Sequence, residues 1–368
     1  MRTTPALVYT EDPGGGNRIF LDRLVPNELS TVTGLQWTTT YPGGDSSWSC
    51  GLNADPNLSH LGLNLGRQVT IVKGGAIRFQ GKLATAARGV PWQLQGPGAF
   101  SVAITSAGSG GFIAVAPTSG NAYNLDEIIS NAQTRGLQWT VPTPLPGSLS
   151  IPTAGTAASG SCDLDTAFGT VGKALGLVVS LSPLQAVTMA APPTTARYVL
   201  RPQQALTPTL AGFTQAVGLY SGGVLLASNP AAQAKWGNLE GVYDMTSLEG
   251  TTPLDATTAG NYLSNWLTAN LAYPTYTSTL TVQTGQLRVV HGTAMGGPVD
   301  LSTVRAGHLI DVYDINPDHS HLLAPGPLQI LTGQTSYDDD TDTLTVTPVG
   351  AIGTDLLAAL YAGQGGAL

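Results

Sequence analysis

Short runs in which apolar and polar residues alternate, each cut by Gly or Pro, occupy both ends of this chain. Examples are QVTIV at 68–72, AIRFQGKL at 76–83, LRVVHG at 287–292 and DTLTVTP at 342–348. A period of two is typical of half-buried strands, and short strands at this spacing favour small antiparallel barrels or sandwiches. The sequence therefore predicts a mainly β protein, in which FSVAIT at 100–105 is expected to be one more strand.

One hairpin pattern occurs twice. The segment GRQVTIVKGGAIRFQG at 66–81 contains two strand-like runs around a Gly-Gly turn, and GHLIDVYDINPDHSHLLAPGPLQI at 307–330 contains similar runs around a longer turn. Laying Gly66 on Gly307 matches apolar residues in both runs: Val69 with Ile310, Ile71 with Val312, Ile77 with Leu328 and Phe79 with Ile330. The pattern indicates a duplicated β unit.

Three segments between the β-rich ends are expected to be helical. In NLDEIISNAQTRG (124–136), Asn124 and Glu127 have the spacing of a capping box. A second helix is expected to start near Ser161 and to end at Gly176. The third, at 258–272, has an apolar stripe at helical spacing: Leu263, Trp266, Leu267 and Leu271.

The chain length and these patterns together predict several modules. At 368 residues the chain is long enough for more than one hydrophobic core. We expect mainly β structure with an α+β insertion: a first β-barrel-like domain at 1–115, an α/β inserted domain at 116–200, a mixed β/helical segment at 201–275 that partly joins the second barrel, and a second β-barrel-like domain with a C-terminal tail at 276–368.

The charge balance argues against a protein that grips nucleic acid. Lys and Arg number 15 against 23 Asp and Glu, for a net charge of −8, whereas DNA binding depends on clustered basic residues. No apolar run reaches the roughly 20 residues that a membrane-spanning helix needs, and the N-terminus has no signal-peptide core. The two cysteines, Cys50 and Cys162, have no metal spacing. We expect a chain made and assembled in a cytoplasm, with no membrane-spanning segment and no specific nucleic-acid binding.

No segment has the pattern of a catalytic, cofactor-binding or metal-binding site. The glycine-rich stretch 107–120 lacks the Lys and Ser/Thr of a phosphate loop. DINPDHSH at 314–321 resembles the start of a calcium loop, but it lacks the glycine at the sixth position and has Pro325 where the bidentate Glu belongs. Asp338 and Asp340 are expected in an exposed hairpin turn, where nothing would raise a pKa as a glycosidase acid requires. We therefore expect no enzyme, no cofactor and no metal.

Four aromatic residues near the N-terminus leave two interpretations open: Trp37, Tyr41, Trp48 and Trp92. Exposed flat rings could stack on sugars, which would favour a glycan-binding protein. Their alternation within predicted strands favours core packing instead.

The same segments resemble a known protein family. TGLQWTTTYPGG (33–44), LGRQVTIVKGGAIRFQGKL (65–83) and CDLDTAFGTVGKALGLVVSLSP (162–183) resemble parts of the tail hub, also called the minor tail protein or baseplate hub, of actinobacterial siphophages. The segments 235–272, 300–317 and 330–348 resemble its acidic strand, last helix and C-terminal hairpins. We expect no appended lysozyme, peptidase or lectin-like domain, which disfavours a wall-cleaving hydrolase.

The resemblance implies a structural protein of the virion tail tip. In that family the two β-barrel-like domains are tube domains, and three subunits place six of them in a ring that joins a sixfold tube to a threefold tip. Expected partners are two further copies of the chain, a distal tail or tail tube protein, downstream tip or fibre proteins, and the tape measure protein in the lumen, through which DNA passes. The alternative is a glycan-binding surface or receptor-binding tail protein.

Overall fold

The computed structural model describes thirteen ranges of the chain: 6–11, 18–20, 32–53, 65–87, 89–104, 112–115, 125–146, 161–200, 208–249, 253–276, 279–291, 294–312 and 328–349. The fold is mainly β, as the sequence predicts. None of the helices in these ranges has the length and apolar character that crossing a membrane requires.

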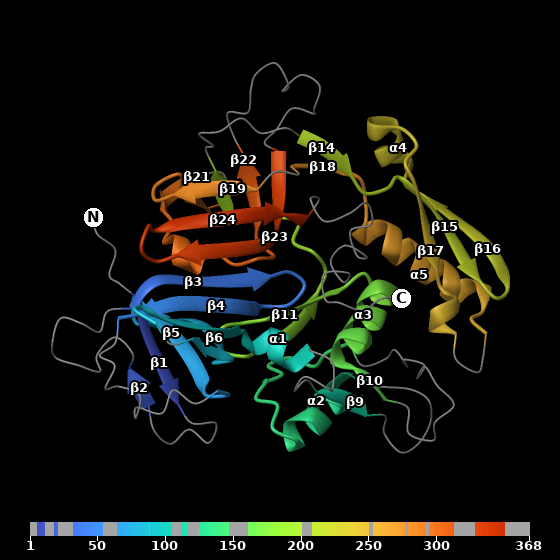
Figure 1. Ribbon diagram of the computed structural model, residues 1–368. Helices are drawn as coiled ribbons and strands as arrows, with labels where there is room; N and C mark the ends of the chain where they lie inside the picture. Colours follow the sequence, from blue (N-terminus) through green and yellow to red (C-terminus); the bar gives the residue numbers. More distant parts are fainter. Residues whose placement is uncertain are drawn as a thin grey trace.

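An eleven-stranded sheet joins the two ends of the chain (Figure 1). Its strands, in spatial order, are β21 (Ala294–Pro298), β20 (Leu287–His291), β13 (Tyr198–Leu200), β22 (Leu309–Val312), β23 (Leu328–Asp338), β3 (Val32–Thr40), β4 (Asp45–Leu52), β8 (Trp92–Pro97) and β7 (Thr85–Ala87), while β24 (Thr343–Pro348) pairs with both β23 and β19 (Leu280–Gln283). The 3-10 helix η4 (Leu301–Thr303) precedes β22. Strand β13 was expected within the α/β domain at 116–200. It pairs instead with β20 and β22 in the large sheet.

A four-stranded sheet packs beneath the N-terminal half of the large sheet (Figure 1). It consists of β2 (Arg18–Phe20), β1 (Leu7–Glu11), β5 (Gln68–Lys73) and β6 (Ala76–Lys82), in that spatial order. Its apolar face, with Val69, Ile71 and Phe79, shares one core with Trp37 of β3 and Ile310 of β22. The two ends of the chain therefore fold around a common interior.

Residues from the middle of the chain form most of a second hydrophobic core. It is formed by α1 (Ala99–Ile104), α2 (Leu125–Thr134), α3 (Leu164–Leu175), β11 (Val178–Leu181), β12 (Val187–Ala190) and α5 (Ala256–Ala269). The strands β9 (Ile113–Val115) and β10 (Ser161–Asp163) pair with each other beside α2 and α3. Trp139 stacks on Phe100 and tilts against Phe168, with ring centroids 5.6 and 6.1 Å apart. Tyr41, Leu309 and Leu331 of the large sheet belong to this core as well.

Residues 208–276 form an outlying α/β layer (Figure 1). The strands β15 (Gln215–Tyr220), β16 (Gly223–Ser228) and β17 (Glu240–Asp244) form one sheet, and β14 (Pro208–Ala211) pairs with β18 (Tyr273–Tyr276). The helices are α4 (Pro230–Trp236), η3 (Thr246–Leu248) and α5 (Ala256–Ala269). The predicted stripe of α5 is buried at Leu263, Trp266 and Leu267, and Leu271 lies just beyond the helix.

The repeated hairpin is present in both copies and closes in the same way. Gly66 and Gly307 both have positive φ, +87° and +89°. The N–H of Gly66 donates to the Leu83 carbonyl, and the N–H of Gly307 donates to the Thr332 carbonyl, both at 2.7 Å. These matched geometries give the sequence repeat a structural counterpart.

The alignment of the second strand of the repeat was wrong. Val69 pairs with Gly81 as Ile310 pairs with Ile330, so Phe79 corresponds to Leu328 and not to Ile330. The sequence gives no residue that fixes the partner of each strand position. A bulge between Ile71 and Val72 further shifts the register of β5 against β6 near the turn.

Two other predictions of secondary structure need correction. The segment 100–105, expected as a strand, lies largely in helix α1, where Phe100 and Ala103 are buried three positions apart on one face. Its apolar run is too short and too continuous to separate a strand from a helix by periodicity. The helix expected near Ser161 begins at Leu164, after the short strand β10, while Gly176 ends it as predicted with a φ of +66°.

Candidate functional site

The two halves of the large sheet meet at a seam between β3 and β23. Strands β3 and β23 pair antiparallel from Thr40 opposite Gln334 to Gln36 opposite Asp338. Inside the seam, the hydroxyls of Thr39 and Thr335 hydrogen bond at 2.7 Å. Strands from the two ends of the chain thus form one continuous sheet.

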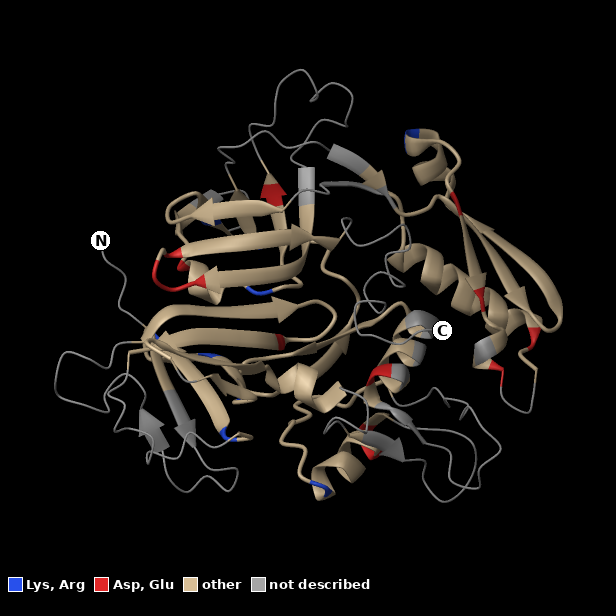
Figure 2. Ribbon diagram, in the orientation of Figure 1, with Lys and Arg blue, Asp and Glu red and all other residues tan. Residues whose placement is uncertain are grey.

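The solvent face of this sheet carries hydroxyls and amides. One row of cross-strand neighbours runs over seven strands: Thr85, Gln95, Ser49, Gln36, Asp338, Thr343 and Gln283. The adjacent row contains Ser47, Thr38, Ser336, Thr345 and Thr281. Asp338 is the only charged residue in either row, and Figure 2 shows acidic residues gathered along the ribbon at the β23–β24 turn. These two rows are therefore polar and contain no Lys or Arg, the residues that hold phosphates.

A buried ion pair fixes three parts of the chain behind this face. The guanidinium of Arg305 lies 2.7 Å from the Asp45 carboxylate, which is 1% exposed. Arg305 also donates to the carbonyls of Arg78 and Leu181. The other oxygen of Asp45 accepts the N–H of Gln80 at 2.8 Å. Burial raises the pKa of Asp45 despite the opposing effects of Arg305 and Gln80.

Glycines let the backbones meet at this junction. A Cβ on Gly44 would lie 2.6 Å from the Leu181 carbonyl oxygen, and a Cβ on Gly307 would lie 2.5 Å from the Tyr41 ring. The N–H of Gly43 donates to the carbonyl of Val179. The YPGG turn between β3 and β4 therefore docks against β11, which explains why the motif contains two glycines.

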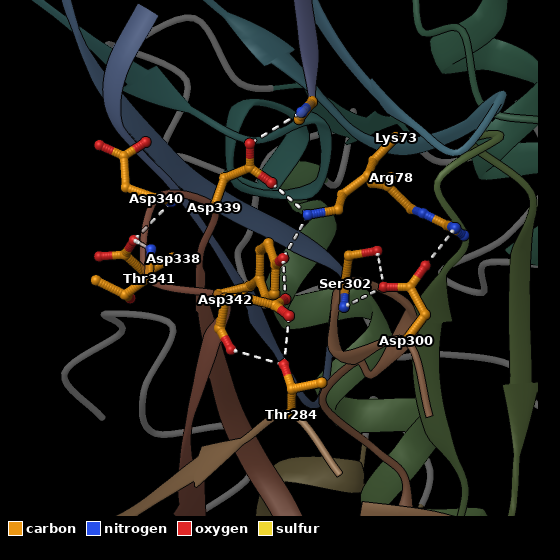
Figure 3. Close-up of polar contacts among 12 residues, drawn as sticks. Lys73, Arg78, Thr284, Asp300, Ser302, Asp338, Asp339, Asp340, Thr341 and Asp342 are labelled. Carbon is orange, nitrogen blue, oxygen red and sulfur yellow. Dashed lines mark hydrogen bonds and ion pairs between the residues drawn. The ribbon is translucent and has the colours of Figure 1, made fainter. Parts of the chain in front are cut away.

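A second buried ion pair ties the acidic turn to the N-terminal sheet (Figure 3). Lys73 Nζ lies 2.6 Å from both Asp339 Oδ1 and the Tyr337 hydroxyl, and the Lys73 and Asp339 side chains are 4% and 6% exposed. Tyr337 donates to Asp342 at 2.6 Å, and Asp342 also accepts from Thr284. Burial is the main cause that raises the pKa of Tyr337, and the hydrogen bond to Asp342 and the charge of its carboxylate add to the rise. The turn was expected to be exposed throughout, which is wrong for Asp339, because Lys73 reaches it from a distant strand.

His308 lies between two arginines at the same junction. Its Nδ1 accepts the backbone N–H of Arg305 at 3.2 Å, and its Nε2 lies 3.4 Å from the Arg197 guanidinium. Burial, then the charges of Arg197 and Arg305, lowers the pKa of His308 to about 4. The ring is neutral at physiological pH, so it adds no third positive charge beside the two arginines.

The structure describes only some of the residues that the sequence analysis singled out. Trp37, Tyr41 and Trp48 are buried, and Trp92 packs against the same core as Trp37 and Trp48, so the core-packing interpretation is confirmed. Cys50 is buried, and burial raises its pKa to about 12. DINPDHSH, most of the glycine-rich stretch and Asn124 lie outside the described residues. Within the described ranges, no group of three or more His, Cys, Asp or Glu is placed to hold a metal ion.

Two tail proteins are among the solved structures that resemble this chain in fold. The 43 kDa tail protein of prophage MuSo2 from Shewanella oneidensis is 11% identical with a TM-score of 0.52, and the match covers 96% of this chain and 99% of that chain. The tail protein from Neisseria meningitidis MC58 is 11% identical with a TM-score of 0.53, covering 94% and 95%. The chain shares the fold of these two tail proteins. No protein-family model and no curated protein sequence matches it.

The seam, the buried ion pairs and the polar face were not foreseen from the sequence. The strands themselves were predicted, but their partners are up to 302 positions apart, as in the contact of Gln36 with Asp338. The alternation of Ser, Thr and Gln in β3, β4 and β24 was the available signal.

Proposed function

We propose that the chain is a structural protein of a bacteriophage tail tip, a homotrimeric hub that joins a sixfold tail tube to a threefold tip. Two of its solved neighbours are called tail proteins, and the shared fold supports carrying that role to this chain. The proposal includes the expected partners: a distal tail or tail tube protein above, tip or fibre proteins below, and the tape measure protein in the lumen. It assigns no enzymatic activity.

The two matched hairpins carry the proposal: β5–β6 in the four-stranded sheet and β22–β23 in the large sheet. A chain with two copies of one β unit presents two similar edges, so three chains present six. The Arg305–Asp45 pair and the close glycine contacts hold the two units rigidly in register. Rigid coupling is what an adaptor between two symmetries requires.

The polar face supports a channel lined by this sheet. A surface of hydroxyls and amides without Lys or Arg releases no counterions when DNA approaches, so it gives the polyanion little affinity. DNA can therefore pass the face without being retained. In this proposal the rows that contain Ser49 and Thr345 point into the lumen.

Native mass measurement and electron microscopy of the purified full chain test the assembly. We expect a particle of three times the 37.8 kDa chain mass, ring-shaped and with an open centre. A chain that stays monomeric at all accessible concentrations, alone and with tail tube protein, would contradict the proposal.

A further inference from the structure

The outlying sheet exposes an apolar surface with an acidic rim. Strand pairing places five aliphatic side chains side by side on the face opposite α5: Val217, Leu219, Val224, Leu226 and Val242. Val224, Leu226 and Val242 are 63%, 79% and 59% exposed. Glu240 and Asp244 lie on the same face, at the two ends of β17. We call these seven residues the acidic face.

The inner side of this sheet is already covered, so the acidic face is its free side. Gly218 packs against Leu263, and Gly241 packs against Phe213 and Trp266, so tightly that an added Cβ would lie within 3 Å of them. Three exposed aliphatic residues in registered positions exceed the scattered apolar residues of an ordinary surface. Such a patch marks a contact surface.

A second surface of the chain has the opposite charge. A cavity of about 330 Å³, lined mainly by apolar residues such as Ala99, Val102 and Phe112, opens beside α1. Two exposed leucines directly precede wall residues: Leu65 before Gly66, at 67%, and Leu184 before Gln185, at 69%. Exposed Lys82 belongs to the wall, and exposed Arg135 directly precedes the wall residue Gly136. We call Leu65, Lys82, Arg135 and Leu184, with this cavity, the basic pocket.

We propose that the acidic face of one copy docks on the basic pocket of the next copy. Each surface has an apolar centre, and their rims have opposite charges, so the pair is complementary in both respects. The two surfaces are distinct, so the contact is head-to-tail, and repetition of such a contact closes a ring when the rotation allows. This inference rests on the proposed homotrimer and specifies which surfaces build it.

Substitutions on each surface test the contact in the full chain. Leu226→Gln removes an exposed aliphatic side chain, and Glu240→Lys and Lys82→Glu each place like charges across the contact. We expect each to raise the trimer dissociation constant by about tenfold or more in sedimentation velocity. The double variant E240K/K82E restores the charge pairing and should recover most of the affinity. Leu210→Gln, an exposed apolar residue of β14 outside both surfaces, is the matched control.

The outcomes separate this inference from the proposed function. A trimer that withstands Leu226→Gln and both charge reversals would overturn this contact while leaving the hub intact. A loss of affinity without recovery in the double variant would also overturn it, because the acidic face would then meet another partner surface. A wild-type chain that is monomeric at every concentration would overturn both. Circular dichroism and urea unfolding of each variant identify any loss of folding.

Discussion

The guanidinium of Arg305 lies 2.7 Å from the carboxylate of Asp45, although 260 positions separate the two residues in sequence. Asp45 begins β4 in the first β unit, and Arg305 leads into the second hairpin. Both residues contact the first hairpin, because Arg305 donates to the Arg78 carbonyl and Asp45 accepts the Gln80 N–H. The pair therefore links the start of the second hairpin to the first, and Arg305 also reaches the Leu181 carbonyl of the α/β segment.

Replacing Arg305 by Met should strongly destabilise the protein. The substitution leaves the Asp45 carboxylate buried without its partner, which typically costs about 3–5 kcal/mol in the free energy of unfolding. The matched control is Arg78→Met. The Arg78 and Asp300 side chains are 18% and 43% exposed, so the loss of their ion pair should lower the free energy of unfolding by about 1 kcal/mol or less. Urea unfolding at pH 7 measures both; equal losses for the two variants would contradict the prediction.

The cost of Arg305→Met should shrink in acid. The guanidinium opposes the rise of the Asp45 pKa, so its removal moves that pKa further up. The folded variant then takes up a proton at a higher pH than the wild type does, and neutral Asp45 needs no partner. Urea unfolding from pH 7 to pH 4 should show the two stabilities converging; a constant gap would disprove this origin of the loss.

Gly307→Ala should lower the free energy of unfolding more than the same substitution at Gly285, a glycine of similar φ. Gly285 has a φ of +88° and no atom within 4 Å of an added Cβ, so Gly285→Ala should cost about 1–2 kcal/mol for the left-handed backbone alone. At Gly307 the Cβ would also lie 2.5 Å from the Tyr41 ring, so we expect at least about 2 kcal/mol more. Thermal and urea unfolding compare the two variants, and similar costs would mean that Tyr41 moves freely.

Lys73 and Asp339 should behave as a coupled pair. Lys73→Met leaves a buried carboxylate, and Asp339→Leu leaves a buried ammonium group, so each should cost about 3–5 kcal/mol. The double variant should cost less than the sum by at least about 2 kcal/mol, because neither charge is then left alone. A double-mutant cycle by urea unfolding gives the coupling energy, and strict additivity would show that the pair does not interact.

His308 should make the protein less stable as the pH falls below neutrality. Its pKa is about 4 in the folded chain and near 6.5 when unfolded, so the unfolded state binds more protons between these values. The stability from neutral His308 is complete above pH 6.5 and is lost progressively toward pH 4, to a total of roughly 3 kcal/mol. His308→Gln should lose this component, so its stability should fall less than that of the wild type between pH 7 and pH 4.5. Parallel curves would contradict the assignment.

The sequence predicts local structure here much better than it predicts contacts between distant strands. Alternation located most strands, and the stripe of Leu263, Trp266 and Leu267 located α5, because these patterns arise within one element. The bulge at Ile71 could not be predicted, since it depends on the pairing of β5 with β6. The resemblance to tail hubs rested on such local motifs, and the solved neighbours support the fold but leave the actinobacterial hub assignment and the domain boundaries as predictions.

The candidate site depended on contacts that no local pattern encodes. Asp339 looked like one more acid in a solvated turn, and only its approach to Lys73 makes it a buried ion-pair residue. The polar face arises because strands from both ends of the chain come into register, as Ser49, Gln36 and Asp338 do. Each strand contributes only one to three hydroxyl or amide side chains, and no single strand indicates the continuous surface.

Electron cryomicroscopy of the assembled tail tip tests the central claim most directly. We predict three copies of the chain in one ring, with the hairpins at Gly66 and Gly307 at the same radius, about 60° apart, and the row from Thr85 to Gln283 facing the lumen. A ring in which the two hairpins lie at different radii, or a particle with a single copy of the chain, would contradict it.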